Sequence, residues 1–413
     1  MKPIYLDYNA TTPVAPEVVQ AMLPYLGEQF GNPSSAHPYG HSAHAAVERA
    51  RQQLASLLGC QPSEVVFTSG GSEASNLAIK GVLFPLLFGQ AESSCSTTSR
   101  RWWTGWRRWF RRRRWQVITS AVEHPATLRP CRFLEQLGVR ITVLPVDRDG
   151  VVDMEALRRA LRYPTALVTI MHANNEVGTL QPIRDIARLA HEHGALMHTD
   201  AAQSVGKIPV RVEELEVDLL TVAGHKLYAP KGIGALYVRN GISLEPLIHG
   251  AGHESGRRAG TENVPYIVGL GAACQLAERE LPALSVRLQR LRDRLWLELQ
   301  ARLGERIVVN GHPQQRLPNT LNVSFLGCVG AELLQAVPQV AASTGSACHE
   351  GQVQVSPVLQ AMHVPEEVAR GAVRLSVGRF TTEEEIVHAA DWLAQAVSSL
   401  ASRTVPTTVA SQV

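Results

Sequence analysis

The middle of this chain alternates short runs of β-branched and apolar residues with stretches of helical periodicity, and this alternation restricts the fold more than any other feature. Runs typical of strands lie at 65–67, 116–119, 139–144, 166–170, 195–198 and 218–222. Helical stretches lie between them, for example at 72–82, 154–161 and 183–193. Strands that alternate with helices predict an α/β fold with a large, doubly wound, mainly parallel sheet.

The pattern changes from about residue 262. Long helical segments at 267–280 and 284–303 are followed by strand-like runs at 307–309, 319–325 and 373–376. Thr382 and Glu385 have the spacing of a capping box, which predicts the start of a last helix. We therefore expect a large α/β domain at 14–261, a smaller α+β domain made of 1–13 and 262–399, and a flexible tail at 400–413.

Polar side chains follow the predicted strands at the points where these strands end. They are Ser69, His124, Asn175, Asp200 and His225. In doubly wound sheets, ligands bind beyond the carboxyl ends of the strands. We therefore expect these side chains to share one site.

Lys226 is the residue that most narrows the chemistry of this site. It ends the segment Ala-Gly-His-Lys, with Asp200 and Gln203 upstream and Cys348 downstream in a Gly- and Ser-rich stretch. A lysine amine can bond the aldehyde of pyridoxal 5'-phosphate (PLP), and an acidic residue is needed opposite the pyridine nitrogen of that cofactor. A cysteine thiolate could attack a group that the cofactor has activated. The set predicts PLP chemistry beside a cysteine nucleophile.

Each of the other motifs allows a functional and a structural interpretation. Gly71 and Ser72 open a helix and could bind a phosphate, or they could form an ordinary turn with a helix cap. Asp200 could face a pyridinium, cap a helix or pair with an arginine. His124, one of fifteen histidines, could stack on a cofactor or move protons. Arg374 could bind a substrate carboxylate or form an internal ion pair.

The charge of the chain is unevenly distributed. Residues 100–115 hold eight arginines and five of the seven tryptophans, and without those arginines the formal net charge of +3 would be −5. Such a run could bind an anionic membrane, or it could bind nucleic acid through phosphates and bases, which would make the protein a nucleic-acid or scaffold-binding protein. A solvated surface insertion at about 88–115 is the interpretation that we favour, because a lone basic tract is weak support for a function.

Composition restricts the compartment and the class of protein. The 413 residues are 45% hydrophobic, enough for at least one large core. The six cysteines show no paired spacing, which favours reduced thiols and gives no metal-ligand set. No apolar run is long enough to span a bilayer, and the start of the chain has no features of a secretory signal. We expect a cytoplasmic protein without a membrane partner.

These residues lie in segments that resemble the NifS-like cysteine desulfurases, PLP enzymes of the class V aminotransferase fold. The similar segments cover nearly the whole chain apart from roughly 84–115 and the tail. They are YLDYNATTP (5–13), GNPSSAH (31–37), FTSGGSEASNLAIKG (67–81), MHANNEVG (171–178), HTDAAQSVGK (198–207), AGHKLYAPKGIGALYVR (223–239), RAGTENVP (258–265), STGSACH (343–349) and RLSVGRFTTEEE (374–385).

The resemblance implies how the cofactor would be held. Lys226 would bind PLP covalently, Asp200 would pair with its pyridine nitrogen, His124 would stack on the ring, and Gln203 and Asn175 would reach the phenolic oxygen. The phosphate would be held by Gly71, Ser72 and His225, with Thr261 contributed across a homodimer interface.

The resemblance also implies the reaction. Arg374 and Asn175 would bind the substrate L-cysteine, and Cys348, on a loop of the small domain, would take its sulfur as a persulfide and leave L-alanine. The sulfur would pass to an acceptor or scaffold protein for iron–sulfur clusters or thiolated products.

Two departures from the desulfurase pattern stand out. Ala223 occupies a position where a hydroxyl residue is usual, so one hydrogen bond to the phosphate would be lost or replaced. Cys348-His349 followed by Ser-Pro-Val-Leu at 356–359 is similar to selenocysteine lyases, as is an insertion before the strand at 116–119. Release of selenium from L-selenocysteine is therefore the alternative to cysteine desulfuration.

Overall fold

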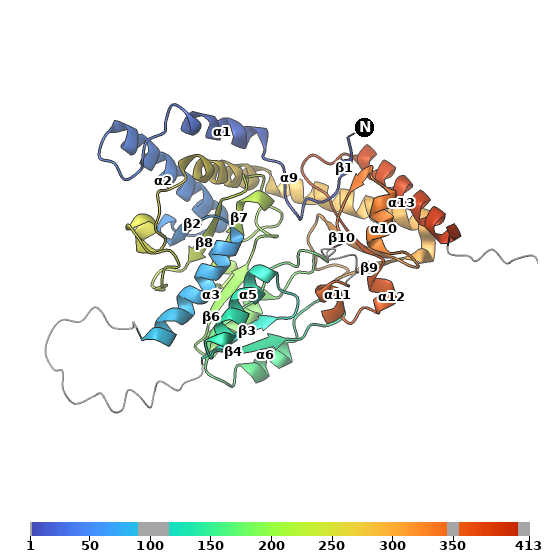
Figure 1. Ribbon diagram of the computed structural model, residues 1–413, viewed down its shortest axis with the longest axis horizontal. Helices are drawn as coiled ribbons and strands as arrows, with labels where there is room; N and C mark the ends of the chain where they lie inside the picture. The colour runs from blue at the N-terminus through green and yellow to red at the C-terminus, as the bar shows by residue number, and fades with distance from the viewer. Residues whose placement is uncertain (1, 90–114, 345–354, 404–413) are drawn as a thin grey trace, which may run out of the picture.

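The computed structural model of the protein describes residues 2–89, 115–344 and 355–403, and Figure 1 shows two lobes. The larger lobe contains a seven-stranded sheet of order β2-β8-β7-β6-β5-β3-β4. Its strands are β2 (Val65–Thr68), β3 (Gln116–Ser120), β4 (Arg140–Leu144), β5 (Thr165–Thr169), β6 (Leu196–Asp200), β7 (Leu219–Ala223) and β8 (Gly234–Val238). Within these ranges β8 alone runs antiparallel to its neighbours. The predicted α/β fold with a mainly parallel sheet is confirmed.

Helices cover both faces of this sheet. They are α1 (Pro16–Leu26), α2 (Pro38–Leu58), α3 (Gly71–Phe88), α5 (Pro125–Gln136), α6 (Met154–Ala160), α7 (Ile183–Glu192) and α8 (Val212–Leu215). Neighbouring residues of a strand enter different cores because their side chains point to opposite faces. Val65 and Phe67 of β2 pack in the core with α2 and α7, whereas Val66 packs in the core with α3 and α5. Strands buried on both faces explain the continuous apolar runs of the sequence.

The smaller lobe is built on an antiparallel sheet of order β12-β10-β9, with β9 (Ile307–Asn310), β10 (Thr320–Phe325) and β12 (Ala372–Ser376). Its core includes residues of the last helix, α13 (Glu383–Arg403), and of α10 (Gly330–Ala336). The start of the chain reaches this lobe as β1 (Ile4–Tyr5), which pairs in parallel with β11 (Val340–Ala341). The remaining elements are α11 (Pro357–Ala361), α12 (Glu366–Ala369) and the short 3-10 helices η1 (Pro62–Glu64), η2 (Gly224–Lys226), η3 (His253–Gly256) and η4 (Gly304–Arg306).

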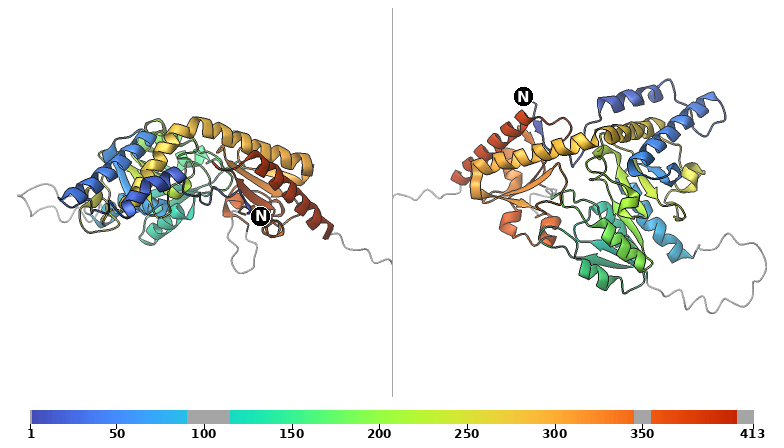
Figure 2. Two further views of the ribbon diagram at one scale, coloured as in Figure 1. Left: turned by 90° about the horizontal axis from the view of Figure 1, so that it is seen from above. Right: turned by 180° about the vertical axis from the view of Figure 1, so that it is seen from behind.

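One 40-residue helix, α9 (Val264–Leu303), belongs to both lobes. Figure 2 shows it running from the α1–α2 region to the three-stranded sheet. The prediction of two separate helices at 267–280 and 284–303 was therefore wrong. Pro282 lies inside α9 and removes one backbone donor, but the residues on either side of it pack into the two cores and keep the segment helical.

The expected domain boundaries differ from the structure at α9 and at α13. Residues Ile267, Leu270 and Cys274 of α9 pack into the core of the large sheet, beyond the expected boundary at 262. The division into domains stays a prediction, because one helix contributes to both cores. The last helix extends to Arg403, so the residues at 400–403, expected in the tail, are helical. Most of the expected insertion at 88–115 lies outside the described residues.

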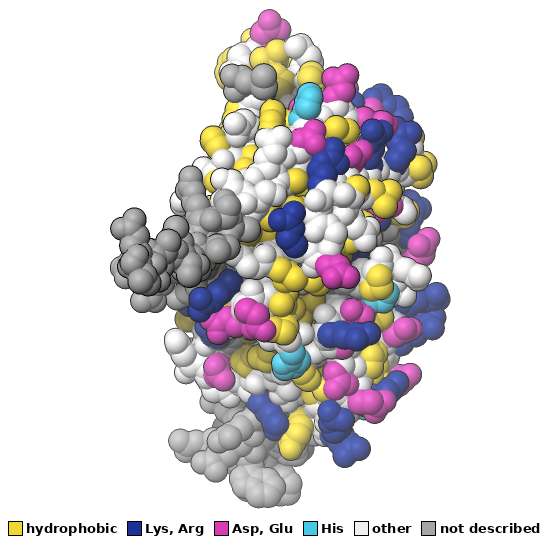
Figure 3. Space-filling model, turned by 90° about the vertical axis from the view of Figure 1, so that its right-hand side faces the viewer, with side chains coloured by type: hydrophobic (Ala, Val, Ile, Leu, Met, Phe, Trp, Pro, Cys, Tyr) yellow, Lys and Arg dark blue, Asp and Glu magenta, His cyan; other side chains and the backbone are white. Residues whose placement is uncertain are grey.

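The surface of the small lobe carries charges of both signs. Figure 3 shows acidic and basic side chains interspersed on this face. Arg294 and Arg290 of α9 both pair with Glu383, and Arg302 pairs with Asp391. In the part of the chain that the structure describes, no helix combines the length and apolarity needed to cross a bilayer.

Two leucines of α9 test the importance of the second core. Leu295 is fully buried and Leu297, two residues away, is 62% exposed. Leu295→Ala should lower the free energy of unfolding by about 2–5 kcal/mol, because it leaves a cavity. Leu297→Ala changes helix propensity equally and should cost less than about 0.5 kcal/mol. Urea denaturation measures both values, and equal losses would contradict the assignment of this core.

Candidate active site

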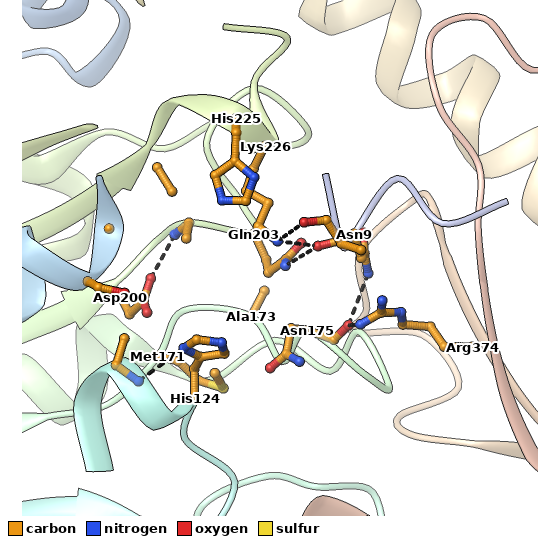
Figure 4. Close-up of a pocket in the computed structure, with 16 residues that line it drawn as sticks. Asn9, His124, Met171, Ala173, Asn175, Asp200, Gln203, His225, Lys226 and Arg374 are labelled. Carbon is orange, nitrogen blue, oxygen red and sulfur yellow. Dashed lines mark hydrogen bonds between the residues drawn. The ribbon is translucent and has the colours of Figure 1, made fainter. Parts of the chain in front are cut away.

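A pocket of about 410 Å³ lies at the carboxyl edge of the large sheet, where the segment before α1 and strand β12 of the small lobe close it (Figure 4). Nine of the twelve predicted site residues line it: Gly71, Ser72, His124, Asn175, Asp200, Gln203, His225, Lys226 and Arg374. Ser69, which was expected to share the site, lines a separate cavity instead. The structure therefore brings together residues that lie as much as about 300 positions apart in the sequence. The two others, Thr261 and Cys348, are considered below.

Lys226 enters the pocket from η2, directly after β7. Its Nζ donates hydrogen bonds to the backbone carbonyl oxygens of Asn9, at 2.5 Å, and Ala10, at 2.6 Å. Burial lowers the pKa of this amine to about 8, with a further contribution from the positive charge of Arg374. A larger fraction of the amine is therefore neutral near pH 7 than in an exposed lysine, and the neutral amine is the nucleophilic and basic form.

Asp200 is the last residue of β6 and is buried on the opposite side of the pocket from Arg374 (Figure 4). Its Oδ1 accepts a hydrogen bond from the backbone N–H of Ala202 at 2.9 Å. Burial raises the pKa of Asp200, and the nearby His124 and Lys226 oppose that shift. Within the described ranges no cationic side chain forms an ion pair with it, so a positively charged ring nitrogen in the pocket would supply the missing partner.

His124 follows β3 and serves as the N-cap of α5. Its Nδ1 accepts a hydrogen bond from the backbone N–H of Ala126 at 3.1 Å, which holds the imidazole in place. Burial lowers the pKa of His124, so the neutral ring is favoured. A neutral ring held at the pocket wall suits stacking on a flat cofactor. The role of His124 as a helix cap was not predicted, and its stacking on a cofactor stays a prediction.

The start of α3 forms the end of the pocket that suits a phosphate. Gly71 and Ser72 are the first two residues of this 18-residue helix, and its N-cap is Gly70, so Ser72 is not the cap that the structural interpretation expected. The backbone N–H groups in the first turn of a helix have no partner within the helix and can bind a phosphate. Ala223 also lines the pocket, and a Cβ placed on Gly71 would lie only 3.2 Å from the Ala223 Cβ. Position 223 is thus adjacent to the start of α3. Because this chain has alanine there in place of the usual hydroxyl residue, the end of the pocket that suits a phosphate lacks one polar group.

His225 completes this end of the pocket. Its Nδ1 forms a hydrogen bond with the Thr11 hydroxyl at 3.2 Å. Burial, with a smaller effect of Lys226, lowers the pKa of His225 to about 4. The imidazole is therefore neutral near pH 7 and would contact a phosphate as a hydrogen-bond donor, without a positive charge.

Arg374 lines the end of the pocket that belongs to the small lobe. Its Nη2 donates to Asp7 Oδ1 at 2.6 Å, and its Nη1 donates to the Asn175 carbonyl at 3.0 Å. The buried Nε has no hydrogen-bond partner among the described residues. Both interpretations from the sequence thus meet here, because the guanidinium forms an internal ion pair and also faces the pocket. Asp7, its partner, was not predicted.

Cys348 lies outside the described residues, but the two ends of its segment are next to the pocket. Before it, the backbone of Ser343 exchanges two hydrogen bonds with that of Arg374. After it, the Ser356 hydroxyl donates to the buried Glu176 at 2.5 Å, one residue from Asn175. The chain therefore leaves and re-enters the described structure beside the wall formed by Asn175 and Arg374.

Thr261 does not reach this pocket within its own chain. It lines a separate cavity of about 170 Å³ with Thr68 and Gly260. Its role as a phosphate ligand across a dimer interface therefore stays a prediction.

Comparison with known proteins agrees with this geometry. The sequence profile described as Aminotransferase class-V matches residues 4–91 and 94–388. The chain belongs to the class-V aminotransferase family. It is 45% identical to "Cysteine desulfurase IscS" of Dictyoglomus turgidum over 96% of this chain and 95% of that protein. It is 42% identical to "Cysteine desulfurase" of Mus musculus over 95% of this chain and 80% of that protein.

Solved structures of the family show the same fold. A protein named "NIFS-LIKE PROTEIN" superposes with a TM-score of 0.83 at 36% identity, over 97% of this chain and all of that one. The structure titled "SspA in complex with cysteine" superposes with a TM-score of 0.75 at 37% identity, over 92% of this chain and all of that one. The class V aminotransferase fold that the sequence predicted is thereby confirmed, as is the resemblance to the cysteine desulfurases.

Several residues of the site were not predicted from the sequence. Asn9 and Ala10 line the pocket, and Asp7 and the buried Lys207 lie behind its wall. The segment YLDYNATTP was noted only for its resemblance. Nothing in the sequence marks Lys207 as buried, because one of its two partners, Asn9, lies 198 residues away.

Besides burial, the charges of Arg374 and Asp7 shift the pKa of Lys226 in opposite directions, and replacing each of these residues tests this. Arg374→Gln removes a cation and should raise the pKa of Lys226, whereas Asp7→Asn removes an anion and should lower it further, each by up to about one unit. The pH dependence of acylation of Lys226 in the apoprotein, followed by peptide mass spectrometry, measures this pKa. Arg379→Gln, which breaks ion pairs with Glu17 and Glu280, is the matched control. Shifts of the same sign in both variants would contradict this account.

Proposed function

We propose that this protein is a cysteine desulfurase that uses PLP to convert L-cysteine to L-alanine and transfers the sulfur to Cys348. The observation that carries the proposal is the arrangement of Lys226, Asp200 and Arg374 in one pocket. Their functions are complementary, because one amine, one buried acid and one carboxylate-binding guanidinium are what an amino acid and PLP require. Full-length similarity to cysteine desulfurases supports the same reaction.

The pocket fits PLP at both ends of the cofactor. The buried carboxylate of Asp200 lacks a cationic partner in contact with it within the described structure, and the ring nitrogen of PLP would be that partner. The other end offers the start of α3 at Gly71 and Ser72, together with the neutral imidazole of His225. His124 would lie against the ring and Gln203 near its phenolic oxygen. When bound, PLP supplies an aldehyde for the amine and a ring that withdraws electrons.

The side chains of the pocket divide the work on the substrate. Arg374 binds its carboxylate, because the guanidinium lines the pocket and carries the charge that a carboxylate requires. Asn175 orients the substrate from the same wall. The Lys226 amine, neutral in larger part because of its lowered pKa, removes the α-proton.

Cys348 is the sulfur acceptor. Its thiolate attacks the sulfur of the substrate, so that an S–S bond forms while the C–S bond of the substrate breaks. The pair of electrons from that bond stays on the substrate carbon, which is protonated to give L-alanine, and Cys348 is left as a persulfide. The ends of its segment, at Ser343 and Ser356, lie beside the wall that binds the substrate.

The setting of the reaction follows from the same resemblance. We expect a cytoplasmic homodimer in which Thr261 of each subunit completes the phosphate site of the other. The persulfide sulfur passes to an acceptor or scaffold protein for iron–sulfur clusters or thiolation. Apart from Trp115, the Arg- and Trp-rich run at 100–115 lies outside the described residues, so the alternative of a nucleic-acid or scaffold-binding protein stays a prediction.

The role of Cys348 can be tested directly. Cys348→Ser should lower the rate of L-alanine formation from L-cysteine by about 100-fold or more, because a serine hydroxyl is too weak a nucleophile to take the sulfur. Cys60→Ser is the matched control, since burial raises the pKa of the Cys60 thiol to about 12 and keeps it unreactive. Unchanged turnover in the Cys348 variant would refute the proposed sulfur transfer.

The same assay distinguishes the two substrates. L-alanine formation from L-selenocysteine by the unsubstituted protein should not exceed that from L-cysteine. A large preference for L-selenocysteine would favour selenocysteine lyase activity instead.

Asp200 should be needed for turnover of L-cysteine more than for binding of PLP. Asp200→Asn keeps the size of the side chain but removes the charge that would hold a protonated ring nitrogen, so kcat should fall by about 100-fold or more while PLP still binds. Steady-state kinetics and the visible absorption of bound PLP measure the two effects separately. Asp185→Asn, on the exposed side of α7, should leave both unchanged.

A further inference from the structure

Lys207 is a buried lysine that the reaction described above does not use. It lies seven residues after the end of β6, in a tight turn where Gly206 adopts a positive φ of 76°. This φ favours glycine at position 206, and a Cβ there would lie 1.9 Å from Leu227 Cδ1, so that leucine would also have to move. The turn directs Lys207 back toward Gln203, four residues earlier.

Among the residues that the structure describes, the amine of Lys207 has two hydrogen-bond partners, and both are amide oxygens. Its Nζ donates to Gln203 Oε1 at 2.8 Å and to Asn9 Oδ1 at 2.8 Å. Within the described ranges no carboxylate pairs with it. Burial, and to a smaller extent Lys226 and Arg374, lower the pKa of Lys207 well below its usual value. A neutral amine has two N–H donors, which match these two acceptors without leaving a buried charge.

The choice of lysine at this place is notable in a chain that holds 35 arginines and only five lysines. An arginine has five donors in a planar fork and stays charged, so it would need more acceptors than the two amide oxygens provide. The compact amine of Lys207 suits a fully enclosed place of this kind.

The contact with Lys207 decides which way the Gln203 amide points. With Oε1 bound to Lys207, the Nε2 end is left to donate, and in this structure it donates to the Asn9 carbonyl at 3.0 Å. Gln203 and Asn9 both line the pocket, and the donor end lies at its wall (Figure 4). Without Lys207 the two ends of the amide are nearly equal in shape and could exchange.

The same amine fixes Asn9, all of whose polar groups are engaged. Its Oδ1 accepts from Lys207 and from Asn319 Nδ2, so its Nδ2 is turned to the Asn175 carbonyl, at 3.2 Å, and to the Thr320 hydroxyl, at 2.8 Å. The Asn9 carbonyl in turn accepts from Lys226. One buried amine thus orients two side-chain amides that contact the pocket.

We propose that Lys207 is a positioning residue that holds the Gln203 amide with its Nε2 as the hydrogen-bond donor toward the phenolic oxygen of PLP. The inference rests on the proposed function, since it concerns the same cofactor. Lys207 itself touches neither the cofactor nor the substrate. It acts through Gln203, and a donor held at a phenolate stabilises the form of the bound cofactor that has lost its proton.

The test is the pH at which the visible absorption of PLP bound to the protein changes. In Lys207→Met this midpoint should rise by about one unit, as expected for the loss of one hydrogen bond to a charged acceptor. Gln203→Leu should raise it equally, and the double variant should show no further rise, because both changes remove the same bond. Lys80→Met removes a lysine that stacks on Phe133 outside the pocket and should leave the midpoint unchanged.

The outcomes separate the two proposals. If the unsubstituted protein shows no visible band with PLP, the proposed function fails. If it does, and Lys207→Met leaves the midpoint in place, or the shifts of the two single variants add in the double variant, the role of Lys207 is overturned. Should Lys207→Met fail to fold in a thermal unfolding scan, Lys207→Ser, which is smaller and lacks the amine, is expected to give the same rise and is judged in the same way.

Discussion

The burial of two amines and one guanidinium in one wall is the constraint on which this site depends. Lys207 and Lys226 are held by oxygens of Asn9, and Lys226 also by the carbonyl of Ala10, while Arg374 pairs with Asp7. Buried polar and charged groups are costly unless each finds hydrogen-bond partners, and the short stretch from Asp7 to Ala10 supplies acceptors to all three side chains. A segment that precedes the first helix therefore determines the chemistry at the end of a sheet that begins some 60 residues later.

The position of that segment depends in turn on the joining of the two lobes. Asn9 contacts Gln203 and Lys226 of the large lobe through its carbonyl, and its side chain reaches Asn319 and Thr320 beside β10 of the small lobe. The helix α9 contributes to both cores and fixes the distance between them. The pocket is thus a product of the interface, and neither lobe alone contains the acid, the amine and the guanidinium.

The charged side chains of the pocket lie at its two ends. At one end Asp200 is an acid in need of a cation, and burial raises its pKa. At the other end Lys226 and Arg374 are cations whose partners are backbone carbonyls and one carboxylate. A cofactor with a basic ring nitrogen and an aldehyde, carrying a substrate carboxylate at its far side, complements both ends.

The sequence by itself determined the order of the strands β2 to β7 along the chain, the residues at their carboxyl ends and the reactive set Lys226, Asp200 and Arg374, because apolar alternation and strand ends are local features. Only the tertiary structure decided that β8 lies between β2 and β7, that α9 is one helix through Pro282, and that Asp7, Asn9 and Lys207 belong to the site. These three features depend on contacts between residues that lie far apart in the chain. The free energy of burying a polar or charged side chain depends on such distant partners, and no local sequence pattern reveals them.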